Sequence, residues 1–320
     1  MYMTDQQALS FLTQMSTYIE AEVDKVIYPD IQYPDLIPID LSAPEWAKSV
    51  TRFISDKVGA AQWFNANARD VPRADVLMTK QEIEVAMAAI GYGYNLEELA
   101  QAQAMAVIRP GYHLDVDRAD AARRAYEEFL DRVLLLGDTV KGFVGMSNNP
   151  VITVTPAAPI GNLNGATNSS LWANKTPDQQ LADVNNALSG IYTGTNTVEW
   201  ADTVLLPITR LLSFSSSARS ATADTTILKF LQEANAYSAV TGRQLTVRGV
   251  RGLDTAGAGG TARMVAYRRD PMVLKAHIPM RHKFLAPMRT GPMIYEVPGI
   301  FRFGGLEIKR PGAMRYVDGI

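Results

Sequence analysis

Histidine and cysteine, the side chains best suited to nucleophilic catalysis and metal binding, are scarce in this chain of 320 residues. The chain has no cysteine, which excludes disulfides, thiolate metal sites and cysteine nucleophiles, and which fits folding in a reducing cytoplasm. Its histidines are His113, His277 and His282, and the last of these lies between Arg281 and Lys283. Because neighbouring cations oppose metal binding, we interpret His277 and His282 as structural or interface residues.

Other motifs that could support catalysis are incomplete. Residues 257–260 read Gly-Ala-Gly-Gly, as in a phosphate-binding loop, but a predicted strand follows where a dinucleotide site needs a helix. The serine-rich residues 213–220 lack the Gly-x-Ser-x-Gly elbow of hydrolases, so we expect a loop there. Adjacent glutamates such as Glu97 and Glu98 do not face each other on a helix. We therefore assign no catalytic, cofactor-binding or metal-binding residue and expect no cofactor.

The charge balance argues against a dedicated nucleic-acid binder. Lysine and arginine number 31 against 33 acidic residues, a formal net charge of −2, whereas phosphate recognition usually needs a clear basic excess. Arg243, Arg248, Arg251 and Arg263 could form a basic patch. No aromatic residues are interleaved with them, which favours ordinary surface charge or pairing between subunits.

Membrane and secretion signals are not recognisable in the sequence. No run of about 18 apolar residues occurs, so we expect no membrane span. Residues 1–12 lack the basic start of a secretory signal. We expect the protein to stay where it is made or to leave by cell lysis.

The N-terminal segment predicts a helix followed by an extended arm. Apolar residues recur at spacings of three and four over residues 5–26, which is typical of an amphipathic helix. Pro29, Pro34 and Pro38 then oppose helix and favour extended backbone. Such a beginning is unusual for a compact enzyme.

A long hairpin is predicted next, from strands at residues 49–58 and 71–79. Its apolar residues fall on both sides of the ribbon, so neither side is a clean core face. An isolated hairpin is only marginally stable in water, and exposed aromatic side chains need cover. Phe53, Ile54 and Trp63 are therefore the best candidates for contacts with another subunit.

The remaining sequence predicts an α+β fold. Asn95 can cap a first helix, Gly137 suits the end of a longer one, and Thr176 with Gln179 forms a capping box. The predicted helices span residues 95–107, 116–136, 176–191 and 224–236. The predicted strands span residues 203–206, 244–250, 262–267, 273–278, 294–297, 301–303 and 306–309.

The order of several short motifs resembles that of tailed-bacteriophage major capsid proteins with the Hong Kong 97-type fold. The likeness covers about residues 46–320 and depends on order and spacing, since no single motif is strongly specific. The most specific is the turn after the long helix, Gly-Met-Ser-Asn-Asn-Pro at residues 145–150. The other motifs are Trp46, Asp-Val-Pro at 70–72, Gly-Tyr-Asn-Leu-Glu-Glu at 93–98, Leu-Gly-Asp at 136–138, Tyr-Arg-Arg-Asp-Pro at 267–271, Ile-Pro at 278–279 and Arg-Phe-Gly-Gly-Leu at 302–306.

This resemblance implies a division of the chain. Residues 1–44 would be an N-terminal arm and residues 45–84 an extended β-hairpin loop reaching over a neighbouring subunit. Residues 85–150 and 265–320 would form a peripheral domain built on a long spine helix. Residues 151–264 would form an axial domain around the fivefold and sixfold positions.

The same resemblance implies a structural function. The chain would assemble with itself into pentamers and hexamers of an icosahedral phage head, within a virion made in the host cytoplasm. Packaged double-stranded DNA would be contacted non-specifically, as the charge balance suggests. Portal, scaffolding and decoration proteins are further candidate partners, and no membrane is expected.

Three alternatives remain at the level of sequence. One is an encapsulin-like shell of a bacterial nanocompartment, one is a hydrolytic enzyme with an unrecognised site, and one is a phage tail or connector protein. Some relatives also crosslink a loop lysine to a neighbour's asparagine. Lys48, Lys57, Asn148 and Asn149 have suitable types but match no crosslinking motif, so we interpret them as solvated lysines and turn asparagines.

Overall fold

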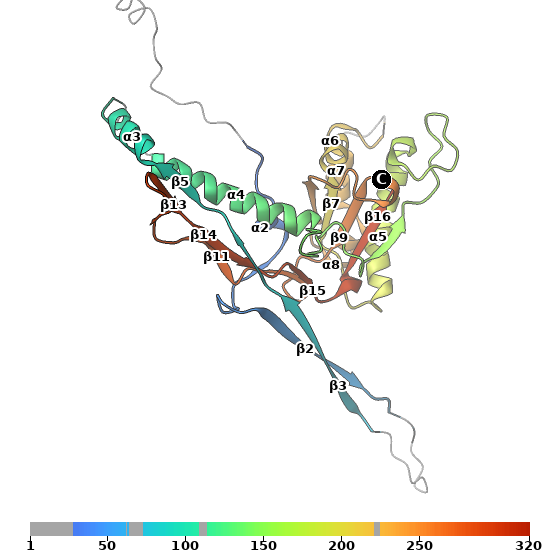
Figure 1. Cartoon of the computed structure of the whole chain (residues 1–320). Coiled ribbons are helices and arrows are strands. Elements are labelled where there is room, and N and C mark those ends of the chain that lie inside the picture. The colour runs from blue at the N-terminus through green and yellow to red at the C-terminus, as the bar shows by residue number, and fades with distance from the viewer. Residues whose placement is uncertain (1–27, 62, 64–72, 109–113, 221–224) are drawn as a thin grey trace, which may run out of the picture.

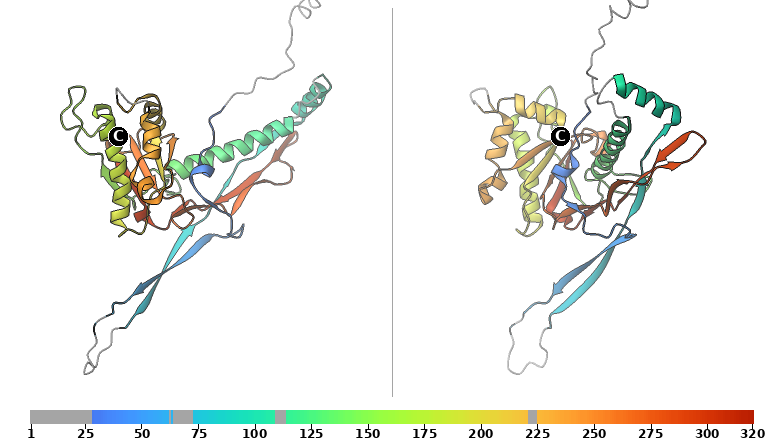
Figure 2. Two further views of the ribbon diagram at one scale, coloured as in Figure 1. Left: turned by 180° about the vertical axis from the view of Figure 1, so that it is seen from behind. Right: turned by 90° about the vertical axis from the view of Figure 1, so that its left-hand side faces the viewer.

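The computed structural model describes residues 28–61, 63, 73–108, 114–220 and 225–320, with only the backbone at 103–108 and 114–115. The predicted helix at residues 5–26 and His113 lie outside this part. The molecule is elongated (Figure 1), with a two-stranded hairpin at one end and helix α3 (Leu96–Ile108) at the other. Both further views show the hairpin extending away from the rest of the chain (Figure 2).

The arm that precedes the hairpin contains one helical turn, α2 (Tyr33–Leu36), and the short strand β1 (Ile39–Asp40). The expectation of a purely extended arm was therefore wrong at α2. Pro34 lies in the first turn of the helix, where its missing N–H would have no partner. The carboxylate of Asp131 accepts the backbone N–H groups of Gln32 and Tyr33 at 2.9 and 2.8 Å, which satisfies two donors at the helix start.

The hairpin consists of β2 (Ser49–Val58) and β3 (Asp75–Glu84), antiparallel in an unbroken register from Ser49 opposite Glu84 to Val58 opposite Asp75. The predicted outgoing strand is confirmed. The predicted return strand at 71–79 ended too early, and its first residue lies outside the described part. The return strand continues to Glu84 because every β2 residue down to Ser49 has a cross-strand partner.

The middle of the molecule packs the 23-residue helix α4 (Leu114–Leu136) against small sheets. Gly137 follows α4 with φ +84°, the predicted left-handed end. Asn95 caps α3, since its side chain accepts the N–H of Glu97 at 3.2 Å. The sheets have the orders β1-β10-β15, β11-β14-β4 and β12-β13-β5. Their strands are β4 (Ala86–Ala89), β5 (Tyr92–Asn95), β10 (Leu274–His277), β11 (Met280–Phe284), β12 (Met288–Arg289), β13 (Ile294–Val297), β14 (Gly299–Phe303) and β15 (Leu306–Ile308).

A five-stranded sheet with the order β6-β16-β9-β7-β8 forms the other half. Its strands are β6 (Thr153–Pro156), β7 (Thr203–Pro207), β8 (Thr246–Val250), β9 (Arg263–Tyr267) and β16 (Met314–Asp318). Strand β16 comes from residues that we assigned to the peripheral domain, so this sheet crosses the predicted domain border. The helices beside it are α5 (Pro177–Gly194), α6 (Ile208–Ser216), α7 (Ile227–Glu233) and α8 (Ala236–Thr241), and short 3₁₀ turns span Trp172–Asn174, Ala258–Gly260 and Pro311–Ala313.

Two helix predictions in this half need correction. Residues 213–216, expected in a loop, end helix α6, because Phe214 and its apolar neighbours pack against the core. The single helix predicted at 224–236 is two helices. The side chain of Asn235 accepts the N–H of Ser238 at 2.8 Å and caps α8, which ends the preceding helix.

The five-stranded sheet separates two hydrophobic cores. Leu205, Val265 and Tyr316 point into the core shared with α4. Their neighbours Val204 and Val317 point into a second core with α5, α6 and α7. The alternation follows from the twofold side-chain period of a strand, which exposes opposite faces at successive residues.

Candidate functional site: the projecting hairpin and its base

The hairpin carries large apolar side chains that no described part of the chain covers. Phe53 is 67% exposed and Trp63 is fully exposed, while Ile54 is 40% exposed. In the register, Phe53 pairs with Lys80 and Ile54 with Thr79, so the two apolar residues lie on opposite faces of the ribbon. The structure thus brings the three predicted contact residues onto one projection without giving them a partner.

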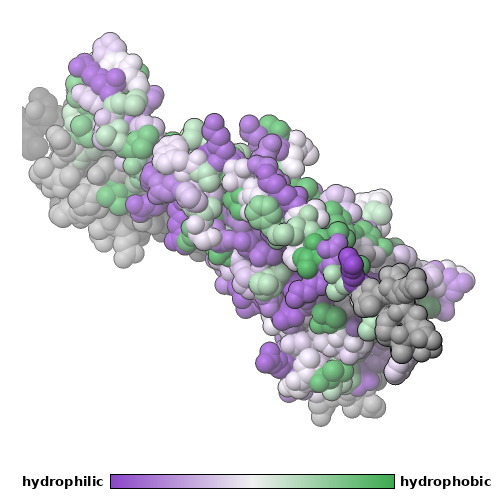
Figure 3. Space-filling view, turned by 90° about the horizontal axis from the view of Figure 1, so that it is seen from below, coloured by the Kyte–Doolittle hydropathy of each residue, from purple (hydrophilic) through white to green (hydrophobic). Residues whose placement is uncertain are grey.

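Around this projection, apolar and hydrophilic residues are interspersed. Seen from below, the surface shows green and purple residues side by side rather than one continuous apolar area (Figure 3). Val58, Val76, Leu77 and Met78 add to the exposed apolar residues of the ribbon. A mixed surface of this kind suits a protein interface, whose core is apolar and whose rim is polar.

A cluster of charged residues with a buried centre joins the base of the hairpin to the arm and to the middle sheets. At its centre Glu307, which is 3% exposed, lies 3.2 Å from the Arg52 Nε and 2.9 Å from the His277 Nε2. Lys275 pairs with Asp40 and lies 3.9 Å from Glu307. We call Asp40, Arg52, Lys275, His277 and Glu307 the base cluster. It ties strand β2 to β1, β10 and β15.

The base cluster keeps its carboxylates ionised. Burial alone would raise the pKa of Glu307, but the hydrogen bond from His277 and the positive charges of Arg52 and Lys275 hold it below the ordinary value. Burial opposes ionisation of Asp40 as well, and its bonds with Lys275 and Ser42 still hold the pKa of Asp40 far below the ordinary value. Because each buried charge has an opposite partner, the cluster can fix the direction of the hairpin.

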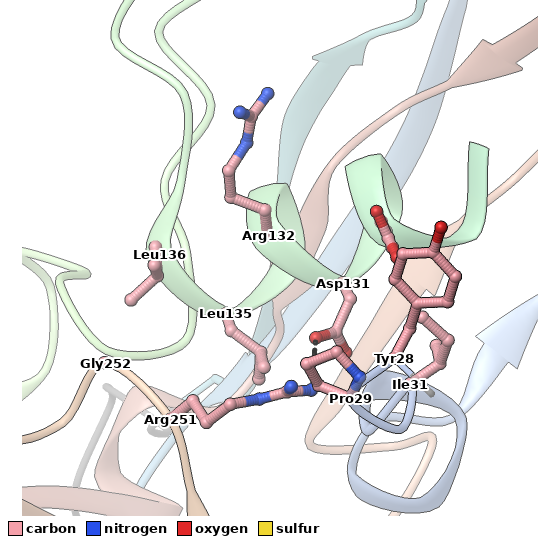
Figure 4. Close-up of a pocket in the computed structure, with 10 residues that line it drawn as sticks. Tyr28, Pro29, Ile31, Asp131, Arg132, Leu135, Leu136, Arg251 and Gly252 are labelled. Atoms are coloured by element: carbon pink, nitrogen blue, oxygen red, sulfur yellow. Dashed lines mark ion pairs between the residues drawn. The ribbon is translucent and has the colours of Figure 1, made fainter. Parts of the chain in front are cut away.

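A cavity lies where the arm crosses α4. A groove of about 380 Å³ is lined by Tyr28, Pro29, Ile31, Glu128, Asp131, Arg132, Leu135, Leu136, Arg251 and Gly252 (Figure 4). Arg251 lies 3.8 Å from Asp131, whose other oxygen binds the arm backbone. The guanidinium of Arg124 lies 4.0 Å from the ring centre of Tyr28. These groups attach the arm to α4.

The two described histidines both contact other residues of this chain. His277 belongs to the buried base cluster. His282 makes a 2.8 Å hydrogen bond with the carbonyl oxygen of Ile90 and stacks on Tyr126. Within the described part of the chain, no group of three histidine or acidic residues is arranged to hold a metal ion.

The glycine-rich loop and Arg263 also have structural roles. The backbone N–H of Ala258 binds Asp318 at 2.9 Å, and strand β9 follows the loop, so the loop holds a carboxylate of its own chain. Arg263 is 8% exposed and makes a two-bond ion pair with Asp318 at 2.6 and 2.8 Å. Arg263 was therefore wrongly placed in a surface patch.

The turn after α4 uses its asparagines locally, as predicted. Asn148 accepts the N–H of Gly145 and donates to the carbonyl of Leu136, both at 2.8 Å. Asn149 accepts the N–H of Val151 at 3.0 Å.

No described helix is long and apolar enough to cross a membrane.

Comparison with known proteins decides the family. The model of the family described as major capsid protein matches residues 59–320, which is most of the chain. This chain belongs to the major capsid protein family. Membership makes it a structural subunit of virion capsids that assembles with itself, and it sets aside the hydrolytic enzyme and the tail or connector protein. A search of curated proteins finds no significant match.

Solved structures confirm the predicted Hong Kong 97-type fold of this major capsid protein. The capsid of Myoviridae phage XM1 matches with a TM-score of 0.77 and 17% identity, over 96% of this chain and 98% of that one. Microbacterium phage Oxtober96 matches with a TM-score of 0.60 and 12% identity, over 98% of each chain. The capsid of a native GTA particle matches with a TM-score of 0.59 and 10% identity, over 94% of each.

The base cluster was missed by sequence reasoning. Its members come from residues 40, 52, 275, 277 and 307, and each looks like an ordinary charged strand residue. The one available signal was the charged residues inside otherwise apolar strands, Lys275 in β10 and Glu307 in β15. A buried strand admits such residues only with partners, but the sequence does not say which partners they are.

Proposed function

We propose that this major capsid protein forms the pentamers and hexamers of an icosahedral phage head that encloses double-stranded DNA. Each hairpin reaches over a neighbouring subunit, with Phe53, Ile54 and Trp63 as subunit contacts. The supporting observation is the projecting ribbon itself. Its apolar side chains are exposed on both faces, which is costly in water unless another surface covers them.

The proposed domain borders follow the fold. The arm comprises residues 1–44, the hairpin loop residues 45–84, and the peripheral domain residues 85–150 with most of 265–320. The axial domain comprises residues 151–264, and we now add β16 because it pairs with β6 and β9. Heterologous contacts between such subunits generate closed rings, and rings of two sizes can close a shell.

In this proposal the shell encloses the DNA without binding it tightly. The formal net charge is −2, and the Arg263 guanidinium is already paired within the chain. Phosphate binding with high affinity would need more unpaired cations. Portal, scaffolding and decoration proteins are proposed as further partners of the head.

Electron microscopy with sedimentation of the purified full-length chain tests the proposal. We expect closed shells or rings of five and six subunits. A matched variant replaces residues 56–77 by Asn-Gly, a two-residue turn that joins the cross-strand neighbours Ser55 and Met78. This variant should keep its helical circular dichroism signal and sediment as a single subunit, lighter than the 35.1 kDa of the full-length chain.

Two results would contradict the proposal. One is a full-length chain that stays monomeric even with its candidate scaffold, and the other is normal shells from the shortened variant. The contents of shells purified from producing cells separate the two remaining alternatives. Nuclease-protected double-stranded DNA supports a phage head, whereas enzyme cargo supports a nanocompartment.

A further inference from the structure

Strand β1 attaches the arm to the middle of the molecule along one side of β10. The parallel pairing places Asp40 directly beside His277. The backbone N–H of Ala276 donates to the carbonyl of Pro38 at 2.9 Å, and that of Ile278 donates to the carbonyl of Asp40 at 3.1 Å. Because β1 has two residues, this ladder is short, and side chains must supply part of the attachment.

The ring of His277 is 1% exposed and lies between two carboxylates. Its Nε2 lies 2.9 Å from Glu307. Because an ionised carboxylate can only accept, Nε2 carries the proton of the neutral ring, and Nδ1 is an unprotonated acceptor. That Nδ1 lies 3.6 Å from a carboxylate oxygen of Asp40 and has no hydrogen-bond partner among the residues that the structure describes. Two electron-rich atoms therefore face each other where the arm meets β10.

The charges closest to the two ring nitrogens are negative. Asp40 faces Nδ1 and Glu307 faces Nε2, whereas Arg52 lies against the other oxygen of Glu307, Oε1, at 3.2 Å. Lys275 opposes a second proton on the ring, since it binds the same Asp40 oxygen that Nδ1 faces. Lys309 is a further cation close to these groups, and burial together with the charge of Lys275 lowers its pKa.

The remaining neighbours of His277 carry no charge. Its backbone N–H donates to the carbonyl of Gly305 at 3.1 Å, and its carbonyl accepts the N–H of Gly304 at 2.9 Å. The nearest charged atoms are thus the two carboxylates, and the cations are directed at those carboxylates more than at the ring. This arrangement favours a second proton on the imidazole.

A proton at Nδ1 would reverse the contact between the ring and Asp40. An N–H group replaces a lone pair, so a repulsive contact becomes a charge-assisted hydrogen bond once the 3.6 Å separation closes slightly. Burial opposes ionisation of Asp40, but the bonds from Lys275 and Ser42 hold the pKa of Asp40 far below the ordinary value. The acceptor therefore stays charged between about pH 5 and pH 8, where histidine side chains change charge.

We propose that protonation of His277 strengthens the attachment of the arm to strand β10, so that docking of the arm responds to pH. The protonated ring bonds Asp40 only while β1 lies beside β10, so the docked state binds this proton more tightly than the undocked state. By linkage, docking strengthens as the pH falls and weakens as it rises. The inference goes beyond the proposed shell, because all its groups lie within one subunit.

Hydrogen exchange in the dissociated full-length subunit tests the inference. The amides of Ala276 and Ile278 donate to carbonyls of the arm, so their protection reports directly on docking of β1. Exchange of these two amides is followed by NMR at about pH 7.5 and about pH 5.5. Each rate is divided into that of an unstructured peptide at the same pH. We expect the protection to rise about threefold or more on acidification.

Three variants locate the proton. His277→Gln keeps an N–H group for Glu307 but cannot take up a proton, and Asp40→Asn removes the charge of the acceptor. His282→Gln is the matched control, because the ring of His282 bonds the carbonyl of Ile90 instead of a carboxylate. The rise in protection should disappear in the first two variants and persist in the control.

Three results would overturn the inference. One is protection that stays constant or falls when the unmodified chain is acidified. Another is a rise that survives in His277→Gln or in Asp40→Asn, and the third is a rise that His282→Gln abolishes. If the buried substitution at His277 prevents folding, the unmodified chain and Asp40→Asn decide alone, since the Asp40 side chain is 19% exposed. Shell formation is measured separately, so its failure would leave this inference standing.

Discussion

At the scale of single residues, the base cluster is the main group of interacting charged side chains at the base of the hairpin. Glu307 is 3% exposed and has three cationic or hydrogen-bonding partners, Arg52, Lys275 and His277. Buried ion pairs of this kind contribute little net stability compared with apolar residues, but removing one partner is costly. The cluster therefore acts as a geometric restraint on β2.

We expect Glu307→Gln to destabilise the dissociated subunit by roughly 2 kcal/mol or more, because it removes the acidic partner of the partly buried Arg52 and of the buried His277. The matched control is Glu45→Gln, which removes an exposed partner of Lys283 and should cost little. Chemical unfolding followed by circular dichroism measures both. Equal midpoints for the two variants would contradict a structural role of the cluster.

The effect of Glu307→Gln on the free energy of unfolding should depend on pH. The pKa of Glu307 lies below its ordinary value of 4.5 in the folded state, so its ionisation stabilises the fold above that pH and less as the pH falls. The difference in unfolding free energy between the unmodified chain and Glu307→Gln should therefore narrow as the pH is lowered from about 4.5. A difference that stays constant down to acid unfolding would show that the carboxylate charge is not involved.

Trp63 is the residue-scale test of assembly. It is fully exposed in the subunit, so Trp63→Ala removes no contact within the described chain. We expect fewer shells in sedimentation, with unchanged helicity by circular dichroism. Normal shells from this variant would remove Trp63 from the proposed contacts.

At the scale of elements, local capping signals are well formed. The Thr176 side chain accepts the N–H of Gln179, and the Gln179 side chain accepts the N–H of Thr176 at 3.0 Å, so both ends of the capping box on α5 are present. The helix buries Val184 and Leu188 completely against the five-stranded sheet. The cap therefore positions a main packing element of the half that contains the five-stranded sheet.

Thr176→Ala should lower the unfolding free energy by about 1 kcal/mol, the usual value of an N-cap. Thr193→Ala, near the end of the same helix, removes a hydroxyl whose hydrogen bonds go to the backbone carbonyls of Ser189 and Gly190 in its own helix. That control should be neutral or slightly stabilising, since alanine favours helix. Denaturant midpoints compare the two, and a larger loss at position 193 would contradict the capping argument.

At the scale of the whole molecule, the isolated subunit exposes apolar side chains that neighbouring subunits could cover. Its ends carry exposed apolar side chains that a monomer would leave in water, such as Phe53 and Met78 on the hairpin and Met288 and Ile294 in the sheet β12-β13-β5. Binding of neighbours to these surfaces favours the folded state by mass action. Stability and assembly should therefore be linked.

Scanning calorimetry can measure this linkage. Assembled shells should unfold at a higher temperature than dissociated subunits in the same buffer, by several degrees or more. The transition of subunits prepared from the variant with the shortened hairpin should not rise under conditions that assemble the full-length chain. Coincident transitions for shells and subunits would show that the contacts add nothing to the stability of the fold.

The sequence by itself determined the features set by neighbouring residues. The outgoing hairpin strand, the caps at Asn95 and Thr176 and the left-handed Gly137 depend on local periodicity and turn chemistry. The order of short motifs was enough for the fold and the family. The apolar and aromatic residues of the predicted hairpin selected Phe53, Ile54 and Trp63 as contacts, which remain a prediction.

Only the tertiary structure decided the features made by residues distant in the chain. The helical turn at Tyr33–Leu36 forms because Asp131 supplies acceptors from α4. The cluster around Glu307 combines three strands and the arm, and Arg263 is withdrawn from the surface by Asp318. Local patterns carry no information on such pairings, because the energy of a buried charge depends on which partner the fold places beside it.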